Sequence, residues 1–281
     1  MPRVDIAQTI NSIDFPEQIW EWLDLLGEAA GLSQREALIH DESFFADTLF
    51  KHLLLRSVNK DLNTISAIYI LLRAEFFHQA ASLVRLFCES LITVSYIAQE
   101  PERRSELFFL YSDIEVYNFT KNLLKWERDK ANPNYVERVQ RQLKTLEEKY
   151  EKSKPKFSFV DKRNKLRLYQ NWCNKNISDQ ARECGDNIFR LYEVAYKFLN
   201  SYIHGSAWSM DRQLDYSRKH YNPSIVHQNI AHITRVEFAI WVEWCKFCDC
   251  HLGWHISHEA VRLIDKVEEL EARHFGNLGI S

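Results

Sequence analysis

Apolar side chains recur at intervals of three and four positions along most of the chain, the spacing that places them on one face of an α-helix. Asp14 with Pro16 marks the start of the first such stretch and Gly31 its end, and Ser33 with Glu36 fits the capping box of a following helix. The pattern predicts further helices over about 41–59, 61–99, 101–130, 134–152, 165–175, 178–204, 223–252 and 257–274. Residues 61–99 fit either one long helix or two helices that meet near 74–77.

These helices predict an all-α fold, a helical bundle in which residues 1–281 form one domain. Asn132-Pro133 separates two of the helices and predicts a long charged helical hairpin, followed by a loop at 153–165. We expect the hairpin and loop to be a basic insertion at about 103–165. The chain has only 7 Gly and 6 Pro and lacks both Gly-rich phosphate-binding motifs. We therefore predict neither a dinucleotide-binding fold nor a cofactor.

The N-terminal residues contain no apolar segment of the kind that a secretory signal requires. The most apolar stretch, 83–98, carries Arg85 and Glu89 and is too charged for a typical membrane-spanning helix. Six cysteines are distributed through helical patterns, as is expected of reduced thiols. These features predict a cytoplasmic protein that does not enter a membrane.

Residues 121–170 hold 15 lysines and arginines against 7 acidic residues, although the whole chain has a net charge of −3. A basic segment on an acidic body favours an anionic partner, such as RNA, another nucleic acid or an acidic protein. Aromatic side chains between the basic ones are typical of nucleic-acid-binding surfaces. The candidate contact residues are Arg138, Arg141, Lys144, Lys162, Arg163 and Arg167. A solvated helix face followed by a lysine-rich loop would give the same composition.

Two of the predicted helices carry a narrow polar stripe on an otherwise apolar surface. At 100° per residue, one stripe on the helix 178–204 spans roughly 80° of its circumference and contains Arg190, Glu193, Lys197, Asn200 and His204. The helix around 76–98 has a similar stripe, formed by His78, Ser82, Arg85, Glu89, Thr93 and Tyr96. Each stripe fits either a solvent-facing surface or an ion-pair network, since Arg85 and Glu89 are spaced to pair.

If the two stripes face each other or a shared cleft, they gather side chains suited to metal-independent phosphodiester cleavage. Histidine exchanges protons near neutral pH, and the planar guanidinium group of arginine binds phosphate. The candidate catalytic residues are therefore His204, Asn200, Arg85, Glu89 and His78.

Residues 70–100, with Arg85 and Glu89 at their centre, and residues 190–206 resemble an uncharacterised bacterial all-helical family. The segment from Asn200 to His204 is also similar to the Asn-x-x-x-His part of HEPN ribonucleases. This resemblance implies a helical bundle, usually dimeric, that acts on RNA in phage defence or in a toxin–antitoxin system. It also implies that His204 is the acid–base and that Asn200 orients either the histidine or the phosphate.

One position departs from the HEPN pattern, because those enzymes carry an arginine directly before the asparagine and this chain has Leu199. Arg190 cannot replace that arginine, since it lies about 21 Å from His204 along a helix. Arg85, or a group from a second subunit of a homodimer, would have to supply the guanidinium group.

A run of cysteines and histidines near the C-terminus has the residue types of a zinc site. Its members are Cys245, Cys248, Cys250, His251, His255 and His258. A straight helix offers one metal ion only two ligands, so we predict buried thiols and surface imidazoles here, and no metal.

Three functions are consistent with these patterns. The first is a HEPN-like RNA-acting protein, such as a metal-independent ribonuclease. The second is a non-catalytic module that binds nucleic acid or protein through the basic segment 121–170. The third is a scaffold in a larger defence or toxin complex.

Overall fold

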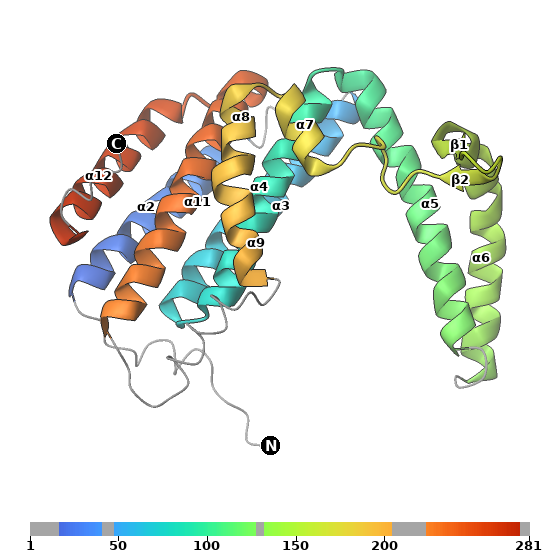
Figure 1. Cartoon of the computed structure of the whole chain (residues 1–281), viewed down its shortest axis with the longest axis horizontal. Helices are drawn as coiled ribbons and strands as arrows, with labels where there is room; N and C mark the ends of the chain where they lie inside the picture. The colour runs from blue at the N-terminus through green and yellow to red at the C-terminus, as the bar shows by residue number, and fades with distance from the viewer. Residues whose placement is uncertain (1–16, 41–47, 128–131, 204–222, 276–281) are drawn as a thin grey trace. The chain divides into compact units, whose positions relative to one another are not determined.

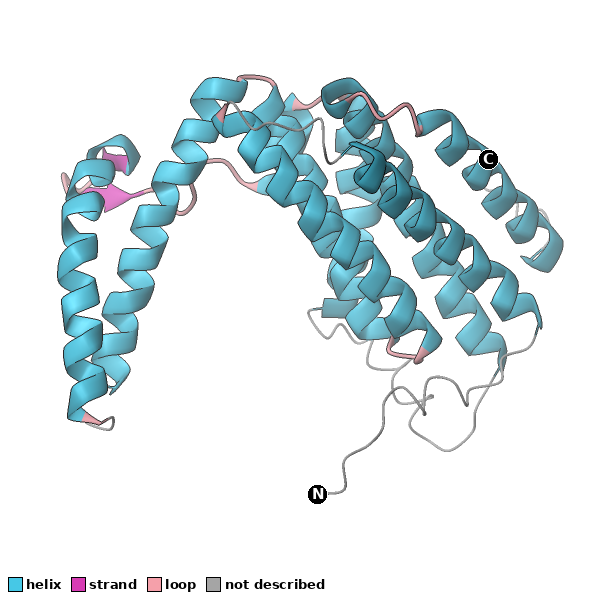
Figure 2. Cartoon of the chain, turned by 180° about the vertical axis from the view of Figure 1, so that it is seen from behind, coloured by secondary structure: helices cyan, strands magenta, loops and turns pink. Residues whose placement is uncertain are grey.

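The structure, a computed structural model, describes residues 17–40, 48–127, 132–203 and 223–275 (Figure 1). Helices dominate these ranges, in which the only strands are the short pair β1 and β2 (Figure 2). The predicted all-α bundle with a long helical hairpin is confirmed. The chain divides into two compact units, one formed by 1–47, 54–96 and 177–281 and the other by 48–53 and 97–176.

The first unit is a bundle of long helices around one apolar core. It contains α2 (Glu17–His40), most of α3 (Leu49–Arg73) and α4 (Phe77–Ala98), α7 (Ile177–Glu183), α8 (Asp186–Leu191), the π-helix η3 (Tyr192–Tyr196), α9 (Lys197–Ile203), α11 (Pro223–Leu252) and α12 (Ser257–Phe275). α11 packs against α2, α12 and α8. Trp22, Phe87, Trp241 and Trp244 are among the largest fully buried side chains.

Two helix boundaries in this unit test the sequence predictions. Of the two alternatives for residues 61–99, two helices that meet near 74–77 are confirmed, because α3 ends at Arg73 and Glu75 takes a positive φ of 60° before α4 begins at Phe77. The predicted helix end at Gly31 is wrong, because α2 continues to His40. The Ser33 hydroxyl does not cap a new helix. It donates to Ala29 O (2.9 Å) and accepts from Trp241 Nε1 (2.8 Å).

α4 is the one helix in the described ranges that is long and apolar enough to cross a membrane by length and composition. A core helix of a folded domain meets the same test, and 61% of the apolar window of α4 is buried. Val84, Phe87 and Leu91 on this helix are fully buried in the core of the first unit. Packing within the bundle therefore accounts for much of its apolar character.

The second unit is built on the helical hairpin of α5 (Pro101–Glu127) and α6 (Pro133–Ser153), which lie side by side (Figure 1). Asn132 caps α6 by accepting a hydrogen bond from the backbone N–H of Asn134 at 2.9 Å. Between the two helices, Tyr117 stacks on Tyr150 with ring centroids 4.1 Å apart. The segment after α6 forms the short 3₁₀ helix η2 (Lys154–Phe157).

Residues 153–175 differ from their prediction as a loop and a short helix. Strands β1 (Ser158–Val160) and β2 (Leu166–Leu168) pair antiparallel, with Val160 opposite Leu166. Helical periodicity is a poor guide to strands of three residues, and the turn between these two strands depends on side-chain hydrogen bonds that periodicity does not register.

Candidate functional site

The segment that carries the proposed Asn-x-x-x-His motif is not the single helix 178–204 that the sequence predicted. It is broken at Gly185, whose φ of 100° and ψ of 176° lie in a region that almost only glycine occupies. It then contains the π-helix η3, in which the N–H of Lys197 bonds to Tyr192 O. π-turns are rare in proteins, and those that are found often lie at functional sites.

The π-turn changes which side chains share a face, because it holds one residue more per turn than an α-helix. Arg190, Glu193 and Lys197 from the predicted stripe are exposed to solvent, and Lys197 pairs with Glu193 at 2.6 Å. Tyr196 is buried, and Asn200 is half-buried one turn later. The predicted stripe is therefore divided between solvent and the interior of the first unit.

α4 runs antiparallel to the α8–α9 segment, as two contacts between them show. The thiol of Cys184 lies 3.8 Å from Ile92 O, and Arg85 contacts Tyr196 twelve residues further along the second segment. From Cys184 to Tyr196 along the second segment, the contacted residue on α4 therefore shifts from Ile92 toward the N-terminus of α4, to Arg85. Because the two segments are antiparallel, α9, which contains Asn200, extends toward the first turns of α4, which contain His78 (Figure 1).

Arg85, Glu89 and Tyr196 form the polar contact between these segments. Arg85 Nη2 donates to the Tyr196 hydroxyl at 2.6 Å, and this hydroxyl donates to Glu89 Oε2 at 3.5 Å. Arg85 also pairs with Glu89 at 3.7 Å and lies over the Tyr196 ring, 4.6 Å from its centroid. Burial, and next the nearby Glu89 carboxylate, raise the pKa of Tyr196, so its hydroxyl stays neutral.

Two polar atoms beside this contact have no hydrogen-bond partner in the described part of the chain. They are Arg85 Nε, a donor, and Asn200 Oδ1, an acceptor, and both are buried. Such atoms in a folded interior are uncommon and call for an explanation, for example a ligand that completes them. Burial also lowers the pKa of His78, which favours its neutral imidazole. His204 lies outside the described residues.

Leu199, the residue that departs from the predicted HEPN pattern, is fully buried in the apolar core. A guanidinium group at this position would be costly because it would be desolvated without a partner. Arg85 keeps 20% of its side chain exposed and approaches the same segment from α4. Lys197, on the same helix as Asn200, is exposed and paired with Glu193, whereas Arg85 reaches this segment from another helix.

The candidate nucleic-acid contacts all belong to the second unit, where their surroundings differ. Arg138 lies over the Tyr135 ring at 5.4 Å, and Arg141 pairs with Glu137 at 3.6 Å. Arg167 pairs with Asp161 at 3.0 Å. Lys144, Lys162 and Arg163 are exposed.

The cysteine-rich end of α11 is a continuous helix to Leu252, with Cys245 and Cys248 fully buried. Burial raises the pKa of both thiols well above the usual range, so they remain protonated. Cys250 is exposed. No cluster of three His, Cys, Asp or Glu side chains that could hold a metal ion occurs among the residues the structure describes.

A buried carboxyl group at Asp61 escaped the sequence analysis. It lies on α3 and its Oδ2 accepts from Trp244 Nε1 at 3.2 Å and from the Ser57 hydroxyl at 3.4 Å. Burial raises its pKa to about 6 in spite of these bonds. Its neighbours Asn59, Lys60 and Asn63 are polar, so the sequence gives no sign that Asp61 is buried, and only the packing of α3 reveals it.

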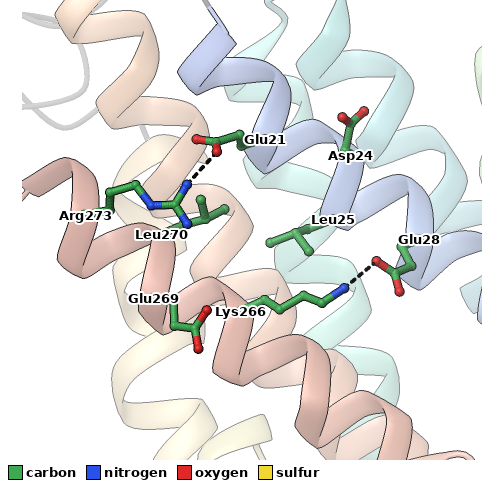
Figure 3. Close-up of a pocket in the computed structure, with 8 residues that line it drawn as sticks. All are labelled: Glu21, Asp24, Leu25, Glu28, Lys266, Glu269, Leu270 and Arg273. Atoms are coloured by element: carbon green, nitrogen blue, oxygen red, sulfur yellow. Dashed lines mark hydrogen bonds and ion pairs between the residues drawn. The ribbon is translucent and has the colours of Figure 1, made fainter.

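A groove of about 280 Å³ lies between α2 and α12 (Figure 3). Its cations are already paired, Arg273 with Glu21 at 2.6 Å and Lys266 with Glu28 at 3.1 Å. No predicted site residue lines it. We therefore base the candidate site on α4 and the α8–α9 segment.

Comparison with known proteins gives one match. The model of a family described as a family of unknown function, DUF5677, matches residues 51–221. No curated protein and no solved structure matches the chain. The predicted resemblance to an uncharacterised family is confirmed at that level, and the matched range includes both segments of the candidate site.

Proposed function

Because the chain belongs to the family of unknown function DUF5677, whose description names no activity, we propose a function from the side chains themselves. The protein is a HEPN-like RNA-acting protein, a metal-independent ribonuclease of the kind used in bacterial phage defence or toxin systems. Arg85, Asn200 and His204 are its principal catalytic residues.

The observation that carries this proposal is the approach of Arg85 to the segment that bears Asn200. Arg85 Nη2 is 2.6 Å from the hydroxyl of Tyr196, one turn before Asn200. The guanidinium group that Leu199 cannot provide is thus available from α4. Tyr196 and Glu89 hold it in place, which reduces the entropy lost when a ligand binds.

The chemistry assigned to these groups needs no metal ion. The imidazole of His204 accepts the proton of the attacking ribose 2′-hydroxyl, and the protonated ring can return a proton to the leaving 5′-oxygen. The guanidinium group of Arg85 binds the phosphate oxygens, on which negative charge accumulates in the transition state. Asn200 orients either the histidine or the phosphate with its amide.

The test is cleavage of a labelled single-stranded RNA by the purified full chain with a chelator present. We expect His204→Ala to lower the rate by about 10²- to 10⁴-fold, the usual contribution of general acid–base catalysis. RNA affinity and melting temperature should stay the same. His258→Ala is the matched control, because this side chain is 75% exposed on α12.

Cleavage by His204→Ala at the wild-type rate would refute the proposal. A different outcome would establish the non-catalytic binding module instead. In that case the wild-type chain and its variants bind RNA without cleaving it, and charge reversal in the basic segment weakens the binding. Exposed cations of the second unit that form no ion pair within the described residues, among them Lys144 and Lys162, favour that alternative as the second candidate.

A further inference from the structure

Positive charge in the second unit is concentrated in the segment 154–167. This segment holds six lysines and arginines and one aspartate, a net charge of +5. α6 holds five basic and four acidic residues, a net charge of +1. The electrostatic attraction for an anion is therefore greatest at the β1–β2 hairpin and not along the helix.

Half of these six cations are neutralised within the unit. The ion pairs are Lys154 with Glu151 at 3.4 Å, Lys156 with Glu106 at 2.7 Å, and Arg167 with Asp161 at 3.0 Å. Lys162, Arg163 and Lys165 are exposed and form no ion pair within the described ranges. All three lie in the turn between β1 and β2.

Asp161 fixes the shape of that turn. Its carboxylate accepts hydrogen bonds from the backbone N–H groups of Arg163 at 2.8 Å and Lys165 at 3.0 Å, and from Arg167 Nε at 3.0 Å. The N–H of Lys165 is the largest of the influences that lower the pKa of Asp161, followed by Arg167. Asn164 adopts the left-handed conformation, with φ 56°. The three free cations are therefore displayed on a preformed turn.

The two faces of the hairpin differ in chemistry. Phe159 lies opposite Arg167 in the strand register, and it stacks on Tyr169 with centroids 5.7 Å apart and the rings inclined by 27°. Phe159 remains 41% exposed. The opposite face presents the cross-strand pair of Val160 and Leu166, which are 60% and 62% exposed. One face is thus aromatic with an arginine, and the other is aliphatic.

We propose that the β1–β2 hairpin is a binding site for single-stranded RNA. The cations of the turn contact successive phosphates, and a base stacks against the exposed part of Phe159, beside Arg167. Stacking on aromatic side chains combined with cations along the backbone is how proteins bind single strands without sequence preference. The choice of RNA among nucleic acids rests on the proposed function, whereas the site rests on the hairpin alone.

An anionic membrane is the competing partner, because Val160 and Leu166 could enter the lipid interface. Two aliphatic side chains form a weak membrane anchor, since durable attachment needs a second strong signal. The aromatic and arginine face would have no role in that case. The charge and the stacking face together favour RNA.

The test is fluorescence anisotropy of a short labelled single-stranded RNA with the full chain, in the His204→Ala background so that the RNA stays intact. The triple variant Lys162→Glu, Arg163→Glu, Lys165→Glu should lose about tenfold or more in affinity, and the slope of log affinity against log salt should fall by about 2. Phe159→Leu keeps an apolar contact with Tyr169 but removes the stacking face, and should cost about fivefold.

The matched control is the triple variant Arg138→Glu, Arg141→Glu, Lys144→Glu, which makes the same charge change on α6. It should weaken binding by less than about threefold, because long-range repulsion is screened by salt. Circular dichroism verifies that each variant is folded. Equal losses in both triple variants, or no loss in the hairpin variants, would overturn the proposal.

Vesicles of phosphatidylcholine with phosphatidylserine provide the second arm. Hairpin-dependent binding to vesicles without hairpin-dependent binding to RNA would overturn the proposal in favour of a membrane site. Cleavage is measured separately in the chain that retains His204. RNA binding that depends on the hairpin, without any cleavage, would support this site and refute the proposed function. Cleavage without hairpin-dependent binding would support the proposed function and refute this site.

Discussion

The contact of Arg85 with Tyr196 and the turn of the β1–β2 hairpin both hold cations, yet they use them in opposite ways. Arg85 is 20% exposed and is held by a tyrosine hydroxyl and a carboxylate from two helical segments. Lys162, Arg163 and Lys165 are exposed on a turn and have no acidic partner among the described residues. A held cation suits a defined geometry, whereas free cations suit capture of an extended anion.

The largest expected effect of this difference is on catalysis. Arg85→Ala should lower RNA cleavage by about 10²- to 10³-fold, because it removes a charged group aimed at the transition state. Arg190→Ala is the control, since Arg190 is an exposed arginine on the neighbouring segment. This variant should cleave RNA at the wild-type rate. Initial rates under saturating RNA decide this, and equal rates for the two variants would remove Arg85 from the site.

A second prediction concerns the pH dependence of stability. Asp61 has its pKa raised from 3.8 to about 6 in the fold, so the folded state binds a proton more readily than the unfolded chain. The stability that protonation of Asp61 contributes is fully present below pH 3.8 and is lost as the pH rises through about 6. Above pH 6 the free energy of unfolding is therefore lower by about 3 kcal/mol than in acid. The loss on moving from acid to neutral pH should be smaller by that amount in Asp61→Asn.

The measurement is urea unfolding of wild type and Asp61→Asn at pH 4 and pH 8. The comparison between the two proteins removes other titrating groups, including the buried Glu237, whose pKa is also raised. Parallel changes with pH in the two proteins would show that Asp61 is not titrating as described. The contact of Arg85 should be unaffected, because Asp61 bonds to Ser57 and Trp244.

The third prediction distinguishes two glycines with different backbone conformations, Gly185 and Gly31. Gly185 lies at φ 100° between α7 and α8, so Gly185→Ala should destabilise the fold by about 2 kcal/mol. Gly31 lies inside α2 with no atom near the position of a Cβ, so Gly31→Ala should stabilise by up to about 1 kcal/mol. Thermal melts of both variants test this, and shifts of the same sign would contradict it.

The smallest expected effect is on the stability of the hairpin variants. Replacement of Lys162, Arg163 and Lys165 by alanine should change the free energy of unfolding by no more than about 0.5 kcal/mol per residue, because unpaired surface cations contribute little. Chemical denaturation measures this. A loss of several kcal/mol would mean that these cations are held within the fold, as Arg85 is.

The sequence predicted the helices that begin at a proline well, although α2 and α3 each continue through a helix boundary that it also predicted, at Gly31 and near residue 60. α5 begins at Pro101, α6 begins at Pro133, and α11 spans Pro223–Leu252, because their apolar faces and capping residues extend over many turns. Periodicity also allowed the hypothesis, beside a solvent-facing surface and an ion-pair network, that the stripes of Arg85 and Asn200 face each other. It did not identify Tyr196 as the group that Arg85 contacts, since a π-turn rotates every later side chain away from the 100° spacing.

The segment 153–175 escaped prediction for a different reason. Three-residue strands provide too few positions for an alternating pattern, and the turn depends on Asp161 hydrogen bonds to residues two and four positions later. The charge of this segment was evident from the sequence, but which cations remain free depends on tertiary pairs such as Lys156 with Glu106. Composition therefore located the basic region, and only the contacts in the structure show which of its cations are free to bind an anion.

The central claim is that Arg85 and His204 act on the same phosphate. A double-mutant cycle of cleavage rates with Arg85→Ala, His204→Ala and the double variant tests it most directly. Residues of one catalytic unit give strongly non-additive losses, so we predict that the double variant is no slower than the slower single variant by more than about threefold. Losses that multiply fully, or an active Arg85→Ala protein, would contradict the account.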